Sequence, residues 1–307
     1  MASPTSATAH RLALVAGFAV LPLFALVVDR LAERFPASTP APPPPEPIVR
    51  VVLPFSPELA STPKQMLDRV RAGTQAVPRR FALRLPAGLT DTVSVDGRKR
   101  QFLAAVLPLV LQANERILAD RARAQALLDR QASGIALSAE GRSWLAGLMA
   151  RYGLSEGDAG FDGLLARVDA VPPSLALAQA ALESGWGTSR FAQDGNALFG
   201  QRTWRTGQGM VPQARDTGRQ FEVKAFETPL QSVEAYMLNL NSHAAYEALR
   251  RQRAAARRQG RPSSGLALAA GLERYSEIGL DYVEKLRALI RGNRLEDFDR
   301  ARLAAAG

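Results

Sequence analysis

The chain of 307 residues contains no cysteine and only two histidines. Without cysteine it forms no disulfide, offers no thiolate nucleophile and holds no zinc finger or Cys-ligated iron–sulfur cluster. Two histidines are too few for a histidine-rich metal site, so we expect no bound metal. The lack of cysteine does not identify a compartment, because it removes only one hazard of an oxidising environment.

The remaining composition is that of a globular protein with a basic balance. Hydrophobic residues make up 47% of the chain and charged residues 22%, which excludes a fully disordered or collagen-like polypeptide. The formal net charge of +10 favours an anionic partner, such as nucleic acid, anionic lipid or a cell-wall polymer. Residues 250–261 carry six arginines in twelve positions, without interleaved aromatics or a nucleic-acid recognition motif. We expect no nucleic-acid partner; a basic face toward wall or lipid and a solvated helix are equally good interpretations of this run.

An apolar run of seventeen uncharged residues lies at 12–28. At the rise of an α-helix it spans roughly 25 Å, the lower limit for crossing a bilayer. Arg11 favours a cytoplasmic segment at 1–11. We expect an uncleaved transmembrane anchor. A cleaved signal peptide, followed by secretion, is the alternative, although residues 29–34 offer no small-residue cleavage site.

A proline-rich linker is expected at 29–60, followed by a helical support region at 61–165. The linker contains PASTPAPPPPEP at 36–47, a polyproline-type spacer that cannot pack a core and holds the next domain away from the membrane. In the support region, apolar residues recur at intervals of three and four over 98–131, which predicts an amphipathic helix. We expect Pro108 to kink or restart this helix.

The most informative segment begins at Pro172-Pro173, which favour a helix start, and reaches the helix stop Gly185. Glu183 stands within the last turn of this predicted helix. The helix C-terminus presents negative partial charge and Trp186 adds apolar bulk, so both disfavour the charged carboxylate and raise its pKa. A carboxyl group that stays protonated near neutral pH suits a general acid. An ordinary surface glutamate at a helix end is the alternative.

Several motifs in order resemble one family. The stretches ALESGWGTSRFA at 181–192 and NALFG at 196–200 resemble the glucosaminidase family of peptidoglycan hydrolases, glycoside hydrolase family 73. Blocks at 226–228, 232–250 and 275–290 are similar to the Bax-type branch of that family. A Glu-Ser motif alone is unspecific, since lysozyme-like transglycosylases carry one too, but several blocks in the right order are specific.

The resemblance implies a mainly α fold: a lysozyme-like helical domain at 166–292 with a small β-hairpin lobe, preceded by the transmembrane helix and support region and followed by a tail at 293–307. The implied activity is hydrolysis of the β-1,4 bond between N-acetylglucosamine and N-acetylmuramic acid in peptidoglycan glycan strands. It implies no metal or organic cofactor. With the anchor, it implies a bacterial inner-membrane protein whose catalytic domain lies in the periplasm.

The resemblance also carries residue roles to this chain. Glu183 is then the general acid, and Tyr275 is the candidate active-site tyrosine. Because the block after Tyr275 reads Tyr-Ser-Glu-Ile-Gly where the family has Tyr-Ala-Thr-Asp-Pro, Tyr282 is a substitute for it. The implied substrate-binding or cleft-supporting residues are Trp186, Asn196, Phe199 and Tyr282.

A second catalytic carboxylate is harder to assign. Inverting hydrolysis needs a base about 6.5–9.5 Å from the acid, and retention needs a closer nucleophile. Between 201 and 226 the sequence offers Asp216, in a turn-like Arg-Asp-Thr-Gly, and Glu222, in an alternating strand pattern. We take Glu222 as the candidate second catalytic residue, with a solvated strand glutamate as the alternative. The substrate's acetamido group is a third source of the nucleophile.

Two further interpretations of the whole protein stay open at this point. A lytic transglycosylase or muramidase would cut the other glycosidic bond of the same polymer. A non-catalytic scaffold would bind peptidoglycan with the same fold but without the chemistry.

Overall fold

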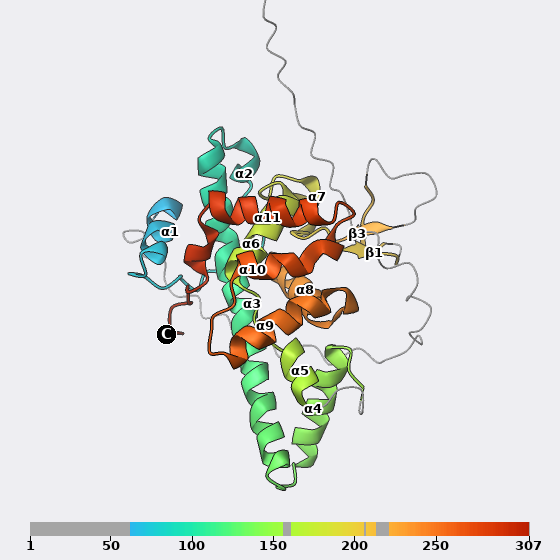
Figure 1. Cartoon of the computed structure of the whole chain (residues 1–307). Helices are drawn as coiled ribbons and strands as arrows, with labels where there is room; N and C mark the ends of the chain where they lie inside the picture. Colours follow the sequence, from blue (N-terminus) through green and yellow to red (C-terminus); the bar gives the residue numbers. More distant parts are fainter. Residues whose placement is uncertain (1–61, 156–160, 206, 213–220, 307) are drawn as a thin grey trace, which may run out of the picture.

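The computed structural model describes residues 62–155, 161–205, 207–212 and 221–306, and it is mainly helical with a small sheet (Figure 1). The predicted fold class is confirmed, whereas the expected anchor at 12–28 lies outside the described residues. In chain order the elements are α1 (Pro63–Arg71), α2 (Gly88–Asp91), α3 (Val95–Ala132), α4 (Ala139–Arg151), α5 (Phe161–Arg167), α6 (Pro173–Ser184), α7 (Arg190–Gly195), β1 (Arg202–Thr203), β2 (Gly209–Met210), β3 (Glu222–Lys224), α8 (Pro229–Ser242), η3 (Ala244–Tyr246), α9 (Glu247–Arg258), α10 (Gly265–Leu268), η4 (Ala269–Tyr275), α11 (Leu280–Gly292) and η5 (Leu295–Phe298).

Helix α3 is the spine of the molecule. Its 38 residues begin at the N-cap Ser94, whose side chain accepts a hydrogen bond from the backbone of Gly97. The helix continues through Pro108, so the expected restart there is wrong; Pro108 and its apolar neighbours are buried. Figure 1 shows α1 and α2 beside one half of α3, and α4 and α5 beside its other end.

Among the described residues, α3 is also the one helix long and apolar enough to cross a membrane. Its most apolar window is 61% buried inside the protein, and such a helix is weak evidence for a membrane span. The high hydropathy of α3 is explained by the packing of its apolar side chains in the hydrophobic core.

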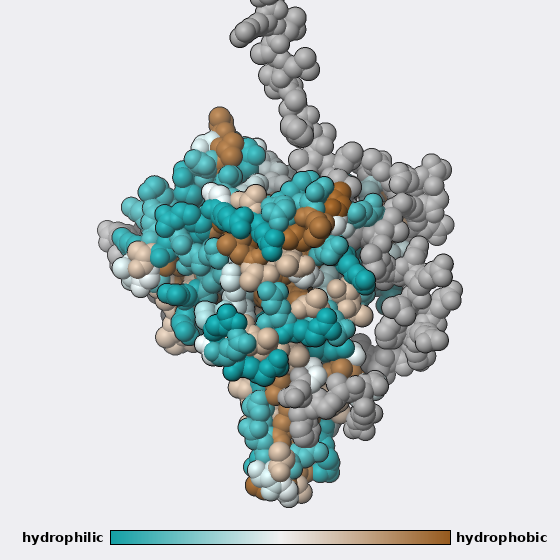
Figure 2. Space-filling model, viewed as in Figure 1, coloured by the Kyte–Doolittle hydropathy of each residue, from teal (hydrophilic) through white to brown (hydrophobic). Residues whose placement is uncertain are grey.

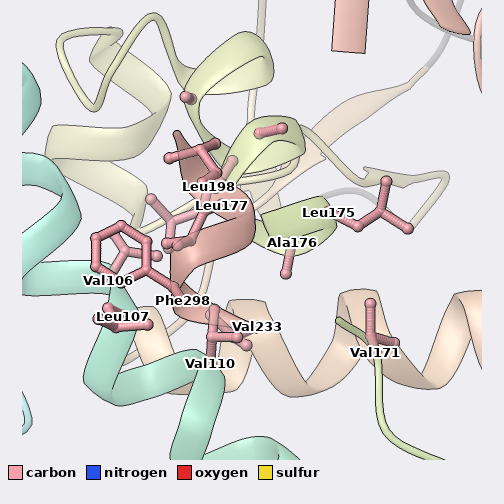
Figure 3. Packing of buried hydrophobic residues seen from close by; sticks show 14 of the residues in the cluster. Val106, Leu107, Val110, Val171, Leu175, Ala176, Leu177, Leu198, Val233 and Phe298 are labelled. Atoms are coloured by element: carbon pink, nitrogen blue, oxygen red, sulfur yellow. The ribbon is translucent and has the colours of Figure 1, made fainter. Parts of the chain in front are cut away.

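Helix α6 lies at the centre of that core. Ten of its twelve residues are buried, because Leu, Ala and Ser side chains allow close approach from every side. It contacts α3, α10, α11 and η5. Figure 3 shows the packing where α6 meets α3, with Val106, Leu107 and Val110 from α3 and Leu175, Ala176 and Leu177 from α6. The same core takes in residues from 66 to 303, including Phe298 and Leu303 near the C-terminal end.

Both ends of α6 are fixed. Its N-cap Pro172 has no capping side chain, and Asp299 supplies one instead, accepting hydrogen bonds from the Ser174 backbone at 2.8 Å and from its hydroxyl at 2.8 Å. At the other end Gly185 adopts a left-handed conformation, as the sequence predicts. Gly187 follows at φ +78°, and a Cβ there would lie 2.9 Å from Phe102, so glycine is required on both counts.

The β-lobe follows α7. It has three short strands in the order β1-β3-β2, all antiparallel, rather than the single hairpin expected. Val223 pairs with Arg202 on one side and with Met210 on the other. Gly209 lies so close to β3 that a Cβ would meet the Val223 carbonyl oxygen at 2.3 Å.

Three of the six arginines at 250–261 make inward contacts: Arg250, Arg253 and Arg257. Arg253 on α9 is 1% exposed and donates to the carbonyls of Asp169 at 3.0 Å, Ala170 at 3.1 Å and Ala166 at 3.0 Å. Arg257 donates through Nε to the Asp169 carboxylate at 2.8 Å. These inward contacts use arginines that both interpretations of the sequence placed in solvent. They join α9 to the loop that leads into α6.

Replacing Arg253 with Met should lower the free energy of unfolding by about 3 kcal/mol, because three buried carbonyls lose their donor and Asp169 loses one of its cations. Urea denaturation followed by circular dichroism measures the change. Arg258→Met is the matched control: Arg258 is exposed at the end of the same helix, and its loss should change stability by no more than about 0.5 kcal/mol. Equal stability of the two variants would contradict the structural role of Arg253.

Candidate active site

Glu183 lies in the last turn of α6, in a helix that is otherwise almost entirely buried. The residue as a whole is partly exposed, whereas its carboxyl group is largely removed from water. Its position at the helix end makes the charged form locally unfavourable. Burial raises the pKa of Glu183 from 4.5 to about 7, and a hydrogen bond from Tyr282 partly opposes this rise.

A directional chain of hydrogen bonds holds the Glu183 carboxyl group. Tyr236 on α8 donates to Gln179 Oε1 at 2.6 Å. Gln179 on α6 donates through Nε2 to the Tyr282 hydroxyl at 3.1 Å, and Tyr282 on α11 donates to Glu183 Oε1 at 2.6 Å. Oε1 is therefore an acceptor. When Glu183 is protonated, its proton sits on Oε2, the oxygen that this chain leaves free for another partner.

The chain belongs to a cluster of tyrosines around Glu183. The rings of Tyr275 and Tyr282 stack at 5.3 Å between centroids, and Tyr246 lies 6.0 Å from Tyr275. Burial, followed by the charge of Glu183, raises the pKa of both Tyr275 and Tyr282 well above 10. All these hydroxyls consequently stay protonated near neutral pH and act as hydrogen-bond donors. The cluster supplies the apolar surroundings that we expected from Trp186.

Among the predicted site residues, Tyr275, Tyr282 and Phe199 lie with Glu183 in this cluster. Tyr282 contacts Glu183 directly, whereas Tyr275 donates to the Phe199 carbonyl at 3.5 Å. Phe199 is buried and stacks on Tyr236 with 3.8 Å between ring centroids. It packs under the hydrogen-bond chain and fixes the ring that starts it.

Trp186 and Asn196 have structural contacts. Trp186 packs edge-on against Phe102 of α3, with 5.7 Å between centroids. Asn196 is 2% exposed, and its amide donates to the carbonyls of Phe226 at 2.9 Å and Glu227 at 3.1 Å. Asn196 thereby ties the loop after α7 to the segment that leaves the β-lobe.

Glu222 anchors the turn of the β-lobe. Its Oε1 accepts from the Gly207 backbone at 3.0 Å, and its Oε2 accepts from Gly209 at 2.8 Å. Both carboxylate oxygens thus accept hydrogen bonds from main-chain donors of the β-lobe turn. The other acid considered in this stretch, Asp216, lies outside the described residues.

Three members of the cluster were not predicted from the sequence: Gln179, Tyr236 and Tyr246. Gln179 carried a signal, because it is one of four polar side chains in an apolar helix and lies four residues before Glu183, on the same face. Tyr236 lies three residues after Val233, on the buried face of α8. Tyr246 stands in a short 3₁₀ turn, where periodicity gives no guidance.

Metal binding finds no support in the described part of the chain, where no three His, Cys, Asp or Glu side chains gather in a metal-binding group. The chemistry available at Glu183 is proton transfer. A carboxylic acid with a raised pKa and one oxygen fixed by a tyrosine hydroxyl can protonate a leaving group.

Comparison with known proteins identifies the class. Residues 164–295 match the model of the glucosaminidase family, described as mannosyl-glycoprotein endo-beta-N-acetylglucosaminidase. The match covers α6, the β-lobe, α8 and α11, and therefore every residue of the hydrogen-bond chain. The protein belongs to this glucosaminidase family of glycoside hydrolases, in its Bax-type branch.

A curated relative defines that branch. The chain is 34% identical over 203 residues to the Protein bax of Escherichia coli (strain K12), an alignment that spans 64% of this chain and 70% of the relative. No solved structure matches the chain. The family relationship implies a carbohydrate substrate.

Replacing Tyr282 with Phe should raise the pKa of Glu183 above its value of about 7, because the hydrogen bond that favours the carboxylate is lost while the ring remains. Carbon-13 NMR titration of labelled glutamate side chains measures the pKa. Tyr246→Phe is the control, since it removes a hydroxyl of the same cluster that bonds Asn239 instead. A pKa that falls in Tyr282→Phe, or that moves equally in both variants, would show that Tyr282 does not hold Glu183.

Proposed function

We propose that this protein is a peptidoglycan hydrolase that cleaves the β-1,4 bond between N-acetylglucosamine and N-acetylmuramic acid, with Glu183 as the general acid. The proposal is carried by the Glu183 carboxyl group, whose pKa is about 7 and whose Oε1 is fixed by Tyr282. A group with that pKa holds its proton near neutral pH and can release it in the transition state.

The proposed reaction begins with the proton on Oε2 of Glu183. As the bond between the anomeric carbon and the glycosidic oxygen breaks, the oxygen takes this proton and leaves as a hydroxyl group. Tyr282 continues to donate to Oε1 and stabilises the carboxylate that forms. A nucleophile closes on the anomeric carbon, and water completes hydrolysis by adding a hydroxyl group there.

The contacts of Glu222 favour a mechanism with one protein carboxylate. Gly207 and Gly209 donate to both of its oxygens, so this carboxylate already has a role in the β-lobe turn. We therefore propose that the acetamido oxygen of the substrate attacks the anomeric carbon. The Glu183 carboxylate then accepts a proton from the water that opens this intermediate, which restores the acid.

The same single carboxylate also favours a second candidate, a lytic transglycosylase. There the Glu183 carboxylate would take the proton of the muramic-acid 6-hydroxyl, whose oxygen then closes on the anomeric carbon. Mass spectrometry of fragments released from sacculi separates the two. Reducing-end N-acetylglucosamine supports the glucosaminidase, and anhydro-muramic ends support the transglycosylase.

The place of action is part of the proposal. The apolar run at 12–28 and the net charge of +10 support a protein anchored in the bacterial inner membrane, with its catalytic domain facing anionic peptidoglycan in the periplasm. Protease protection of Glu183-containing peptides in spheroplasts and in inverted vesicles tests this orientation.

Glu183→Gln should lower the rate of sacculus hydrolysis by about 100- to 10,000-fold, because the amide keeps the shape but cannot donate the acidic proton. The rate of the unmodified protein should fall as pH rises through about 7, since the active form is protonated. Zymography and dye release from sacculi across pH measure both effects. Equal hydrolysis by the two proteins would remove Glu183 from the chemistry. No hydrolysis by either protein, with sacculus binding retained, would favour a non-catalytic scaffold.

Glu222→Gln should retain activity to within about tenfold, because its carboxylate serves the β-lobe turn. Loss of a true catalytic base would cost about 100-fold or more. The same dye-release assay decides between these outcomes. A loss as large as that of Glu183→Gln, with unchanged circular dichroism, would restore Glu222 as the second catalytic residue.

A further inference from the structure

Gln179 is a polar side chain that α6 buries completely. In the view of Figure 2, hydrophilic residues cover most of the described surface, whereas Gln179 is 0% exposed. A buried amide lowers stability unless its donor and its acceptor are both hydrogen-bonded. A methionine would fill a similar volume without that requirement. Packing alone therefore does not explain a glutamine at this position.

The distances on either side of Gln179 fix which way its amide points. Oε1 lies 2.6 Å from the Tyr236 hydroxyl oxygen, a separation that suits an O–H···O bond and is too short for N–H···O. Nε2 lies 3.1 Å from the Tyr282 hydroxyl oxygen, which suits N–H···O and is long for O–H···O. Exchanging the two amide atoms would make both contacts worse. Gln179 therefore accepts from Tyr236 and donates to Tyr282.

The bond from Gln179 decides how Tyr282 meets Glu183. A tyrosine hydroxyl has one proton, and the oxygen of Tyr282 already accepts from Nε2 of Gln179. The proton is consequently directed at Glu183 Oε1, 2.6 Å away. Without Nε2, the Tyr282 oxygen could accept instead, and protonated Glu183 could carry its proton on Oε1. That proton would then be held in a bond inside the protein rather than available for transfer.

We propose that Gln179 is a positioning residue that keeps Tyr282 a donor to Glu183 and thereby leaves the acidic proton on Oε2. Gln179 acts in this role through Tyr282. Tyr236 supports it by bonding Oε1, so that Nε2 faces Tyr282. The consequence for hydrolysis rests on the proposed function, whereas the effect on Glu183 itself does not.

The groups that face Glu183 make its titration a clean measure of this role. Four tyrosines from α8, η3, η4 and α11 lie around it, and burial raises their pKa values to about 12 or well above 10: Tyr236, Tyr246, Tyr275 and Tyr282. These hydroxyls stay neutral while Glu183 titrates at about 7. On α3, Lys99 lies 5.2 Å from the Trp186 ring and is present in every variant compared.

Carbon-13 NMR titration of Glu183 on the full chain tests the proposal in a double-mutant cycle. Gln179→Met keeps the size of the side chain but removes both hydrogen bonds, and it should raise the pKa of Glu183 by about 0.5. The rise has two causes, because Tyr282 becomes a weaker donor to the carboxylate and becomes able to accept from the protonated acid. In a Tyr282→Phe background, Gln179→Met should change that pKa by less than about 0.1, because the residue through which it acts is absent.

Two further variants separate positioning from a general loss of stability. Asn114 of α3 is another buried amide, and it bonds the Val171 backbone in both directions, at 2.7 and 2.9 Å. Asn114→Leu should lower stability toward urea and leave the pKa of Glu183 unchanged. Tyr236→Phe tests the proposal if Gln179→Met does not fold. It releases Oε1 of Gln179 and should raise the pKa of Glu183 by about 0.2, again only while Tyr282 is present.

Proton placement also predicts a kinetic effect. Gln179→Met should lower kcat for glycan strands released from sacculi about tenfold and leave KM within about twofold, because proton transfer is impaired rather than binding. A loss of activity through KM alone would contradict the role of Gln179.

The titrations can overturn the proposal without any assay of hydrolysis. An unchanged pKa of Glu183 in Gln179→Met and Tyr236→Phe would do so, as would an equal rise with and without the Tyr282 hydroxyl. Full activity of Glu183→Gln would refute the proposed function instead, and the double-mutant cycle would still decide whether Gln179 acts on Glu183 through Tyr282.

Discussion

The short hydrogen bond from Tyr282 to Glu183 is the contact on which the site depends. It joins α11 to the end of α6, and Gln179 and Tyr236 extend it to α8. Tyr236 donates to Gln179, Gln179 donates to Tyr282, and Tyr282 donates to Glu183, so the hydroxyl protons of both tyrosines have defined directions. The raised pKa of Glu183 comes from burial, while its geometry comes from the three helices that must pack correctly before the chain can form.

That packing is stabilised by a second buried polar group. Asp169 lies just before α6 and is almost fully buried, with Arg257 and Arg253 on α9 close to it. Buried charges persist only when they are paired and hydrogen-bonded, so the burial of Asp169 requires these arginines to be correctly placed. The Asp169 cluster fixes the start of α6, and the tyrosine cluster fixes its end.

Much of the fold and the principal site residue could be predicted from the sequence. The proline pair and Gly185 bounded α6, and Glu183 could be singled out because a carboxylate is unfavourable at that helix end. The restart expected at Pro108 is wrong, because α3 continues through this residue, which is buried among apolar neighbours. Helical periodicity also treated the arginines of α9 as surface, since it does not reveal that carbonyls of a distant loop lie beneath Arg253.

The site beyond Glu183 could be predicted only in part. Tyr275, Tyr282 and Phe199 came from resemblance, and the structure gathers them with Glu183. The sequence pattern places Gln179 and Tyr236 at ordinary core positions. Their side chains join the hydrogen-bond chain to Glu183 only because α6, α8 and α11 pack together. Glu222 shows the converse, because a strand pattern does not reveal that backbone amides of Gly207 and Gly209 already hold its oxygens.

The cap of α6 has a consequence for how the protein is made. Asp299, which satisfies the N-terminal amide and hydroxyl of Ser174, lies 125 residues later in the chain. During synthesis the helix that carries Glu183 must wait for this late segment, and contacts of such long sequence separation form slowly. The nascent polypeptide therefore acquires the finished cap of α6 only after Asp299 has been translated.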